Sequence, residues 1–184
     1  MDKSGLLGER KNALREATKT VRKTLEAFVD EKSFVETATF GFTKNEFFGE
    51  AEGEVVTGLA TLDDVPVAIV ALNSEVLSGG LTLACCKKIV NLLDKAAATG
   101  SPVVYFLSSL GVAAGEGVNA MEGVAEVLAK MDELKGCVPQ FAVVYGDVLG
   151  SASLFVAQCD FAFFAEKTCV SYASPLVIAA KSGK

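Results

Sequence analysis

The sequence contains no histidine among its 184 residues. This absence excludes the activation of a serine or cysteine nucleophile by histidine, and it excludes every metal site that uses an imidazole ligand. The five cysteines include no CxxC pair, which argues against a zinc ribbon. Their number is odd, which argues against a disulfide framework. We therefore predict no metal site, and any catalysis must use carboxylates, lysines, thiols, a cofactor or the backbone.

Long apolar runs are also missing. No stretch approaches the roughly 18 apolar residues that cross a bilayer, because charged residues or glycine interrupt each one. The polar start at Met1–Ser4 does not resemble a secretory signal. A net charge of −6 argues against a nucleic-acid surface. These features predict a cytoplasmic protein with no membrane span and no nucleic-acid partner.

Apolar periodicity predicts an α/β protein. Residues 10–28 have helical spacing, whereas residues 41–53 indicate an irregular connection. Further along the chain, apolar strands alternate with helices, which is typical of a largely parallel sheet that is buried on both faces. The expected strands are 54–62, 65–72, 102–107, 138–145, 161–165 and 169–172, and the expected helices are 81–98, 118–134 and a short one ending near 158. Asp63-Asp64 between the first two strands indicates a hairpin turn. With no internal linker, we expect one domain over residues 1–184.

Two loops of small residues each leave the carboxyl end of a strand and lead into a helix. The first covers residues 107–117 (LSSLGVAAGEG) and the second residues 146–152 (GDVLGSA). Ligands of open α/β sheets bind at such strand ends, and the start of a helix offers unpaired N–H groups. Neither loop has the spacing of a nucleotide-phosphate motif. Loop composition alone favours a ligand site and a plain tight turn equally.

Several motifs follow one another in the order found in a known family. The chain resembles the biotin-dependent carboxyltransferases, which include the β subunits of acetyl-CoA and propionyl-CoA carboxylases, and it resembles their N-terminal half only. The segments that carry the resemblance are 25–36 (LEAFVDEKSFVE), 54–62 (EVVTGLATL), 65–70 (VPVAIV), 78–80 (SGG), 87–89 (KKI), 94–96 (DKA), 115–118 (GEGV), 138–140 (VPQ), 159–161 (CDF) and 173–175 (ASP).

This resemblance implies a crotonase-like (ClpP/crotonase) fold of repeated ββα units and an acyl-CoA substrate. Carboxyl would pass between the α-carbon of the acyl-CoA and biotin on a carrier protein, while backbone N–H groups hold the thioester enolate. The donors map onto Gly111, Val112, Gly150 and Ser151. A C-terminal-type carboxyltransferase domain or subunit would complete the site, within a homo- or hetero-oligomer.

A CoA-binding role maps onto Gly79, Gly80, Lys87 and Lys88. For the two lysines, a solvated helix face is the favoured interpretation. Glu116 is interpreted as a favourable acid in the first turn of the helix that follows it. The pair Cys85-Cys86 is expected to be buried and inert, and the other three cysteines, Cys137, Cys159 and Cys169, are expected in the core.

The chain departs from the family in both loops. The family's first loop usually reads Ser-Gly-Gly-Ala-Arg, whereas Leu110 and Ala113 replace a glycine and the arginine here; Ser151 stands in the place of a second glycine. Leu110 could occupy space that a substrate needs. Two other functions therefore stay open, a non-catalytic structural subunit of such a complex and another crotonase-fold acyl-CoA enzyme.

Overall fold

A seven-stranded sheet forms the centre of the protein. A computed structural model of the chain describes residues 3–173 and 175–183. The strand order is β1-β4-β5-β6-β7-β8, and β9 pairs with β7 beyond the end of β8. The strands are β1 (Val35–Thr37), β4 (Val55–Leu62), β5 (Val65–Leu72), β6 (Val103–Ser109), β7 (Gln140–Leu149), β8 (Phe161–Phe164) and β9 (Val170–Ser171). The first three are antiparallel, and from β5 onward each pair is parallel.

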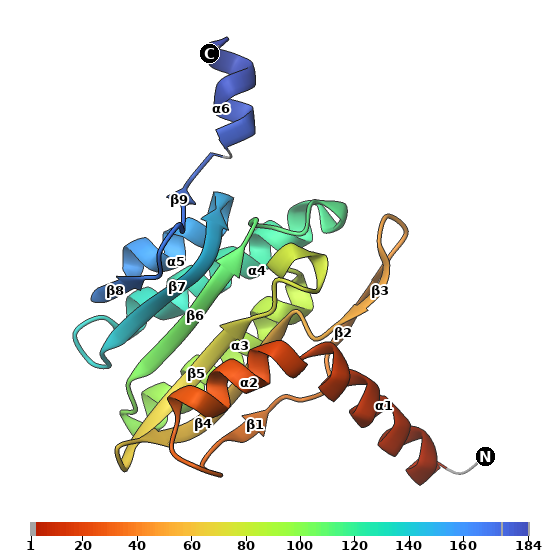
Figure 1. The fold of residues 1–184 in the computed structure, drawn as a ribbon, viewed down its shortest axis with the longest axis vertical. Helices are drawn as coiled ribbons and strands as arrows, with labels where there is room; N and C mark the ends of the chain where they lie inside the picture. Colours follow the sequence, from red (N-terminus) through yellow and green to blue (C-terminus); the bar gives the residue numbers. More distant parts are fainter. Residues whose placement is uncertain (1–2, 174, 184) are drawn as a thin grey trace.

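Helices cover the two faces of this sheet unequally (Figure 1). One face carries only the N-terminal helix α2, whereas α3, α4 and α5 cover the other face; α1 and α6 extend away from the body at opposite ends. The helices are α1 (Lys3–Ala17), α2 (Lys19–Phe28), α3 (Leu83–Thr99), α4 (Val118–Leu134), α5 (Ser153–Gln158) and α6 (Pro175–Ser182), with 3-10 turns η1 (Leu77–Gly79), η2 (Ala114–Glu116) and η3 (Gly150–Ala152). No helix among the described residues is both long and apolar enough to cross a membrane.

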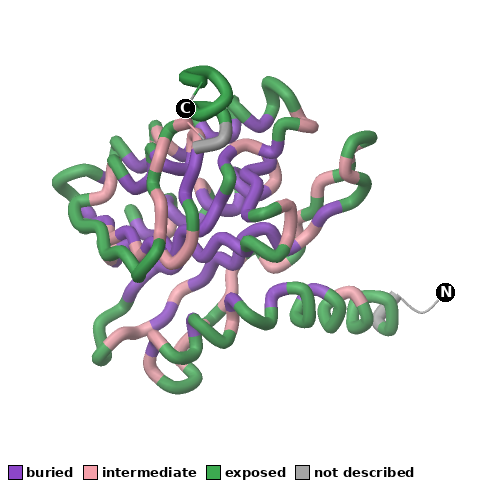
Figure 2. Tube along the Cα trace, turned by 45° about the horizontal axis from the view of Figure 1, so that its top comes forward, coloured by how far each residue is buried: buried purple, intermediate pink, exposed green. Residues whose placement is uncertain are grey.

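The apolar side chains form one cluster on each face of the sheet. Every residue of β6 is buried, because helices lie on both sides of this strand. Figure 2 shows the same distribution, with buried residues along the central strands and exposed residues along α1 and the C-terminal segment. The parallel α/β interior predicted from the continuous apolar runs is confirmed at β5, β6 and β7.

The hairpin predicted at Asp63-Asp64 joins β4 to β5. Both aspartates have positive φ angles, 49° and 63°, as a two-residue primed turn requires. Asp30 fastens the turn from outside, because its carboxylate accepts hydrogen bonds from both turn amides at 3.0 Å. It also accepts from the Thr61 hydroxyl, and these contacts lower the pKa of Asp30, the bond from Thr61 most of all.

Three predicted elements differ from the structure. The helix expected over residues 10–28 is two helices that meet at Thr18, and the first begins at Lys3. The connection expected over residues 41–53 contains a two-stranded hairpin, β2 (Phe42–Asn45) and β3 (Gly49–Glu52). The second loop is shorter than predicted because β7 continues to Leu149. Pairing with β9 extends the strand, and Val148 N donates to Cys169 O at 2.8 Å.

The sheet edge and the cysteines give two further corrections. Strand β8 is exposed along its whole length, so the prediction of a sheet buried on both faces is wrong at this edge. Cys137 is exposed and Cys169 is partly exposed, so these two thiols are not in the core, whereas Cys159 is partly buried and packs against the core. Within the motif 173–175, Ser174 lies outside the described residues.

Candidate functional site

The two predicted loops meet at the carboxyl end of β6 and β7. A Cβ atom built on Gly111 would lie 3.1 Å from Leu149 O, 3.5 Å from Gly150 Cα and 3.6 Å from Ser151 N. Gly111 has a φ angle of 103° and Gly150 one of 59°, which glycine adopts at little cost. Three of the four predicted donor residues therefore share one place, and glycine lets their backbones touch.

The first loop is held by the segment that precedes α3. Leu81 N donates to Gly111 O at 2.9 Å, and Ala113 N donates to Leu81 O at 3.0 Å. In this parallel bridge the central residue, Val112, turns its own N–H away from Leu81. Within the described part of the chain, the Val112 N–H has no hydrogen-bond partner.

The Gly79-Gly80 pair lets this supporting segment approach the loop. A Cβ atom on Gly79 would lie 2.2 Å from Ser108 O, so no side chain fits there. Ser109 Oγ donates to Gly79 O at 2.6 Å and accepts from Gly111 N at 3.1 Å. The Gly111 amide therefore already has a hydrogen-bond partner. Gly79 and Gly80, which were predicted to bind CoA, instead pack against the backbone of the first loop and its neighbours.

The second loop contributes the start of a short helix. Ser151 is the second residue of η3, which leads directly into α5, and the first amides of a helix have no partner inside it. The Ser151 hydroxyl is buried, and it has no hydrogen-bond partner among the described residues. Leu110, which could have blocked the site, is 57% exposed, and its amide donates to Ser78 O at 3.1 Å.

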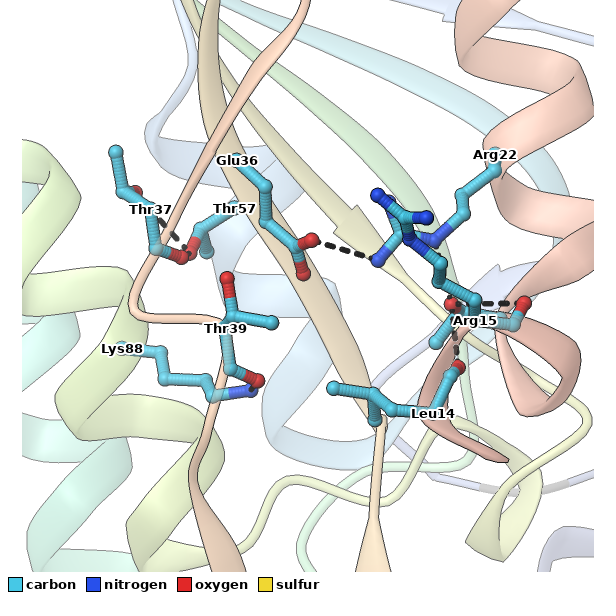
Figure 3. A network of polar contacts seen from close by, with 9 residues as sticks. Leu14, Arg15, Arg22, Glu36, Thr37, Thr39, Thr57 and Lys88 are labelled. Atoms are coloured by element: carbon cyan, nitrogen blue, oxygen red, sulfur yellow. Dashed lines mark hydrogen bonds and ion pairs between the residues drawn. The ribbon is translucent and has the colours of Figure 1, made fainter. Parts of the chain in front are cut away.

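The structure does not bring the two predicted lysines together. Lys88 is buried, and its Nζ lies 3.4 Å from Thr39 O (Figure 3). Lys87 points outward, and its Nζ lies 2.6 Å from a carboxylate oxygen of Glu126. Neighbouring residues of a helix face different directions, so a single phosphate group does not contact both side chains here.

Two arginines of the basic N-terminal helices, Arg10 and Arg22, are already paired with carboxylates. Arg22 donates to Glu36 at 2.7 Å (Figure 3). Its Nε also donates to Thr18 Oγ1 at 2.8 Å. The Arg22 and Glu36 side chains are only 18% and 16% exposed. This pair joins α2 to β1. Arg10 similarly contacts Glu50 and Glu52 of β3.

Two polar residues near the site, Glu54 and Thr82, were not among the predicted site residues. Glu54 is 1% exposed and accepts from Thr82 Oγ1 at 3.2 Å. Burial raises the pKa of Glu54 above its ordinary value. Thr82 caps α3, because its Oγ1 accepts from Cys85 N at 3.0 Å. A charged residue directly before an apolar strand was the only sequence signal for Glu54.

Glu116 was assigned to the wrong helix. It lies in η2, and its Oε2 accepts from Leu83 N at 2.6 Å, at the start of α3 rather than of the following helix α4. An acid is favourable at any helix start, so the interaction is of the predicted type, but the partner is distant in sequence. Its other oxygen accepts from the Thr43 hydroxyl in the β2–β3 hairpin.

The remaining reactive groups are the two buried thiols of α3 and any cluster of side chains that could bind a metal. Cys85 and Cys86 are buried, and burial raises the pKa of Cys86 to about 12. A thiol with so high a pKa is a poor nucleophile at neutral pH. Among the described residues, no group of three or more histidine, cysteine, aspartate or glutamate side chains could hold a metal ion.

Known proteins match almost the whole chain. Residues 13–184 match the carboxyl transferase domain family. The carboxyltransferase subunit of propionyl-CoA carboxylase from Haloferax mediterranei is 31% identical over 154 residues, which are 81% of this chain and 30% of that protein. The methylmalonyl-CoA carboxyltransferase 12S subunit from Propionibacterium freudenreichii is 30% identical over 171 residues, 90% of this chain and 32% of that protein. The chain thus spans about a third of the length of these relatives.

Solved structures agree in fold. A transcarboxylase 12S crystal structure with methylmalonyl-coenzyme A and methylmalonic acid bound has a TM-score of 0.86 and 25% identity, covering 98% of this chain and 39% of that chain. A Pseudomonas malonate decarboxylase hetero-tetramer in complex with malonate has a TM-score of 0.80 and 21% identity, covering 88% of this chain and 63% of that chain.

Proposed function

Since this chain belongs to the carboxyl transferase domain family and has the crotonase-like fold, we propose that it is the acyl-CoA-binding part of a biotin-dependent carboxyltransferase. The observation that carries the proposal is the meeting of the two loops at Gly111 and Gly150, with the unpaired Val112 N–H beside them. Acyl-CoA relatives over most of the chain support the same substrate class.

In the proposed site, the thioester oxygen accepts hydrogen bonds from the amides of Val112 and Ser151. Loss of the α-proton places negative charge on this oxygen, and preorganised N–H groups stabilise such a charge strongly where water is excluded. Gly111 and Gly150 shape the site, because a side chain at Gly111 would collide with the second loop. The arrangement needs no histidine, and the sequence has none.

The carboxyl group moves between the α-carbon of the acyl-CoA and biotin. When the acyl-CoA is carboxylated, its α-carbon loses a proton and gains the carboxyl, while the N1–carboxyl bond of carboxybiotin breaks and N1 is protonated. We assign no residue of this chain to biotin. The proposal places biotin on a carrier protein and a C-terminal-type carboxyltransferase domain or subunit on the other side of the thioester.

Assembly with other subunits is part of the proposal. The 12S relative forms a hexamer, and the malonate decarboxylase relative is a hetero-tetramer. We propose that this chain likewise acts in a homo- or hetero-oligomer, because the 12S structure that matches 98% of the chain belongs to a hexamer.

A pair of matched ligands tests the thioester site. Propionyl-CoA carries the carbonyl oxygen, whereas S-propyl-CoA has a methylene group in its place and is otherwise the same. We expect calorimetry to show that the chain binds propionyl-CoA about tenfold more tightly, which corresponds to one or two net hydrogen bonds. Equal binding of the two ligands, or binding of neither, would contradict the proposal.

Substitution of Gly111 locates this preference. Gly111→Ala places a Cβ atom 3.1 Å from Leu149 O and should reduce the preference for the thioester. Gly136→Ala is the control, because Gly136 also has a positive φ angle, 75°, but no atom lies within 4 Å of its added Cβ. Both variants carry backbone strain of about 1–2 kcal/mol, so only the Gly111 variant should alter the ratio of the two affinities.

A further inference from the structure

The β2–β3 hairpin lies against the first loop, although the two segments are far apart in sequence (Figure 1). Asn45 Nδ2 donates to Gly115 O at 2.5 Å. A Cβ atom built on Gly115 would lie 3.0 Å from two ring carbons of Phe48, so the end of the hairpin leaves no room for a side chain at that position. One polar and one apolar contact therefore join the hairpin to the loop.

A second link runs through Glu116. The Thr43 hydroxyl donates to one carboxylate oxygen of Glu116, and the other oxygen accepts from Leu83 N at 2.6 Å. Leu83 begins α3 two residues after Leu81, which bonds to both neighbours of Val112. The hairpin, Glu116 and the start of α3 thus form one connected support for the loop.

The hairpin meets the first loop across a hollow. The surface between the hairpin and the helices α3 and α4 is hollowed, with a volume of about 450 Å³, and Thr43, Asn45 and Glu116 are among the residues that line it. The hairpin strands pair only with each other, in a sheet separate from the main one. Arg10 also attaches the hairpin to α1, through Glu50 and Glu52. It is therefore the connection of the hairpin to the first loop that depends on Thr43, Asn45 and the hairpin tip.

We propose that the β2–β3 hairpin positions the thioester site. Asn45 and Thr43 hold Gly115 and Glu116, and this fixes the direction of the Val112 N–H three residues before Gly115. The proposal rests on the proposed function, because it assigns Val112 as a donor to the thioester oxygen. A donor stabilises charge well only when its orientation is fixed before the ligand arrives. Asn45 and Thr43 are positioning residues, since they act through the loop and not on the ligand.

Two conservative variants of the full chain test this inference with the same ligand pair. Asn45→Ala removes the donor to Gly115 O, and Thr43→Val removes the donor to Glu116 with little change in shape. We expect each to reduce the ratio of the affinities for propionyl-CoA and S-propyl-CoA by about fivefold, the equivalent of one net hydrogen bond, with little change for S-propyl-CoA. Glu46→Ala is the control, because Glu46 is an exposed neighbour of Asn45 on the hairpin.

The outcomes separate this inference from the proposed function. If the unsubstituted chain prefers the thioester and both variants keep that preference, the positioning role is wrong and the proposed function stands. If the variants bind both ligands equally weakly, the hairpin has a structural role only, and the positioning role is again wrong. If the unsubstituted chain shows no preference for the thioester, the proposed function itself fails.

Discussion

At Gly111, the absence of a side chain lets two loops from different strands touch. The same is true of Gly79, where the backbone of the supporting segment passes under Ser108. In the proposed site, these contacts set the direction of the Val112 N–H, because they hold the loop between β6 and α4 against its neighbours. At the scale of single residues, the proposed site is therefore built from backbone amides and glycine conformations and not from reactive side chains.

Glu54 is a buried carboxylic acid beside the start of α3. It is buried, its carboxylate accepts one bond from Thr82, and burial raises its pKa above 4.5. A raised pKa means that the folded protein holds this proton more tightly than the unfolded chain does. The contribution of Glu54 to stability is therefore fully present below pH 4.5 and is lost as the pH rises through the raised pKa.

We expect Glu54→Gln to remove this pH dependence. Between pH 4.5 and neutrality, the free energy of unfolding of the variant should fall less than that of the unsubstituted chain, because glutamine keeps an acceptor for Thr82 and never acquires a charge. Urea denaturation at a series of pH values measures this difference. Glu122→Gln, at an exposed position of α4, should leave the pH dependence unchanged. Parallel profiles for the unsubstituted chain and Glu54→Gln would contradict the assignment.

At the scale of elements, helix starts are where distant segments join. The start of α3 is capped by Thr82, the residue directly before the helix, and by the carboxylate of Glu116, which lies in the first loop. Both satisfy amides that have no partner inside the helix. A single helix start thus fixes the position of the first loop relative to α3.

We expect Thr82→Val to lower the free energy of unfolding by about 1–2 kcal/mol, the usual cost of losing a cap. Valine has nearly the same shape as threonine but cannot accept from Cys85 N or donate to Glu54. Thr82→Ser keeps the hydroxyl and is the matched control, which should lose much less. Urea denaturation of the three proteins at one pH measures the difference, and equal losses in both variants would show that the methyl group matters and the cap does not.

Element positions could be predicted from the sequence where the pattern is local. The helix at 118–134 and the hairpin turn at Asp63-Asp64 were predicted correctly, because periodicity and turn residues determine them. The β2–β3 hairpin was missed, because its strands lack β-branched alternation and depend on contacts with the first loop. The extra length of β7 was missed for a similar reason, since β9 supplies the partner.

At the scale of the whole molecule, the sheet edge formed by β8 is exposed and apolar. Strand β8 pairs with β7 on one side only, and its three phenylalanines are each about 60% exposed. Phe161 stacks on Phe141 at 5.7 Å, so the apolar surface continues from the edge onto the face that α2 leaves open. Exposed apolar edge strands favour self-association.

We expect Phe163→Lys to reduce self-association of the isolated chain and its binding of a hydrophobic dye. A lysine at an exposed edge opposes pairing with another strand and interrupts the apolar surface. Met121→Lys is the control, because Met121 is 60% exposed on α4, away from this edge, and receives the same charge. Light scattering against concentration measures the effect, and an equal reduction in both variants would attribute it to net charge alone.

The sequence by itself determined the family, the α/β class and the loops that carry the candidate site. These follow from residue order, since periodicity, small-residue loops and motif spacing are properties of the linear chain. Only the tertiary structure decided that Gly111 lies against Gly150, that Glu116 binds the start of α3, and that Lys87 and Lys88 face different partners. These contacts join residues distant in sequence, and their geometry is fixed by packing, which no local pattern contains.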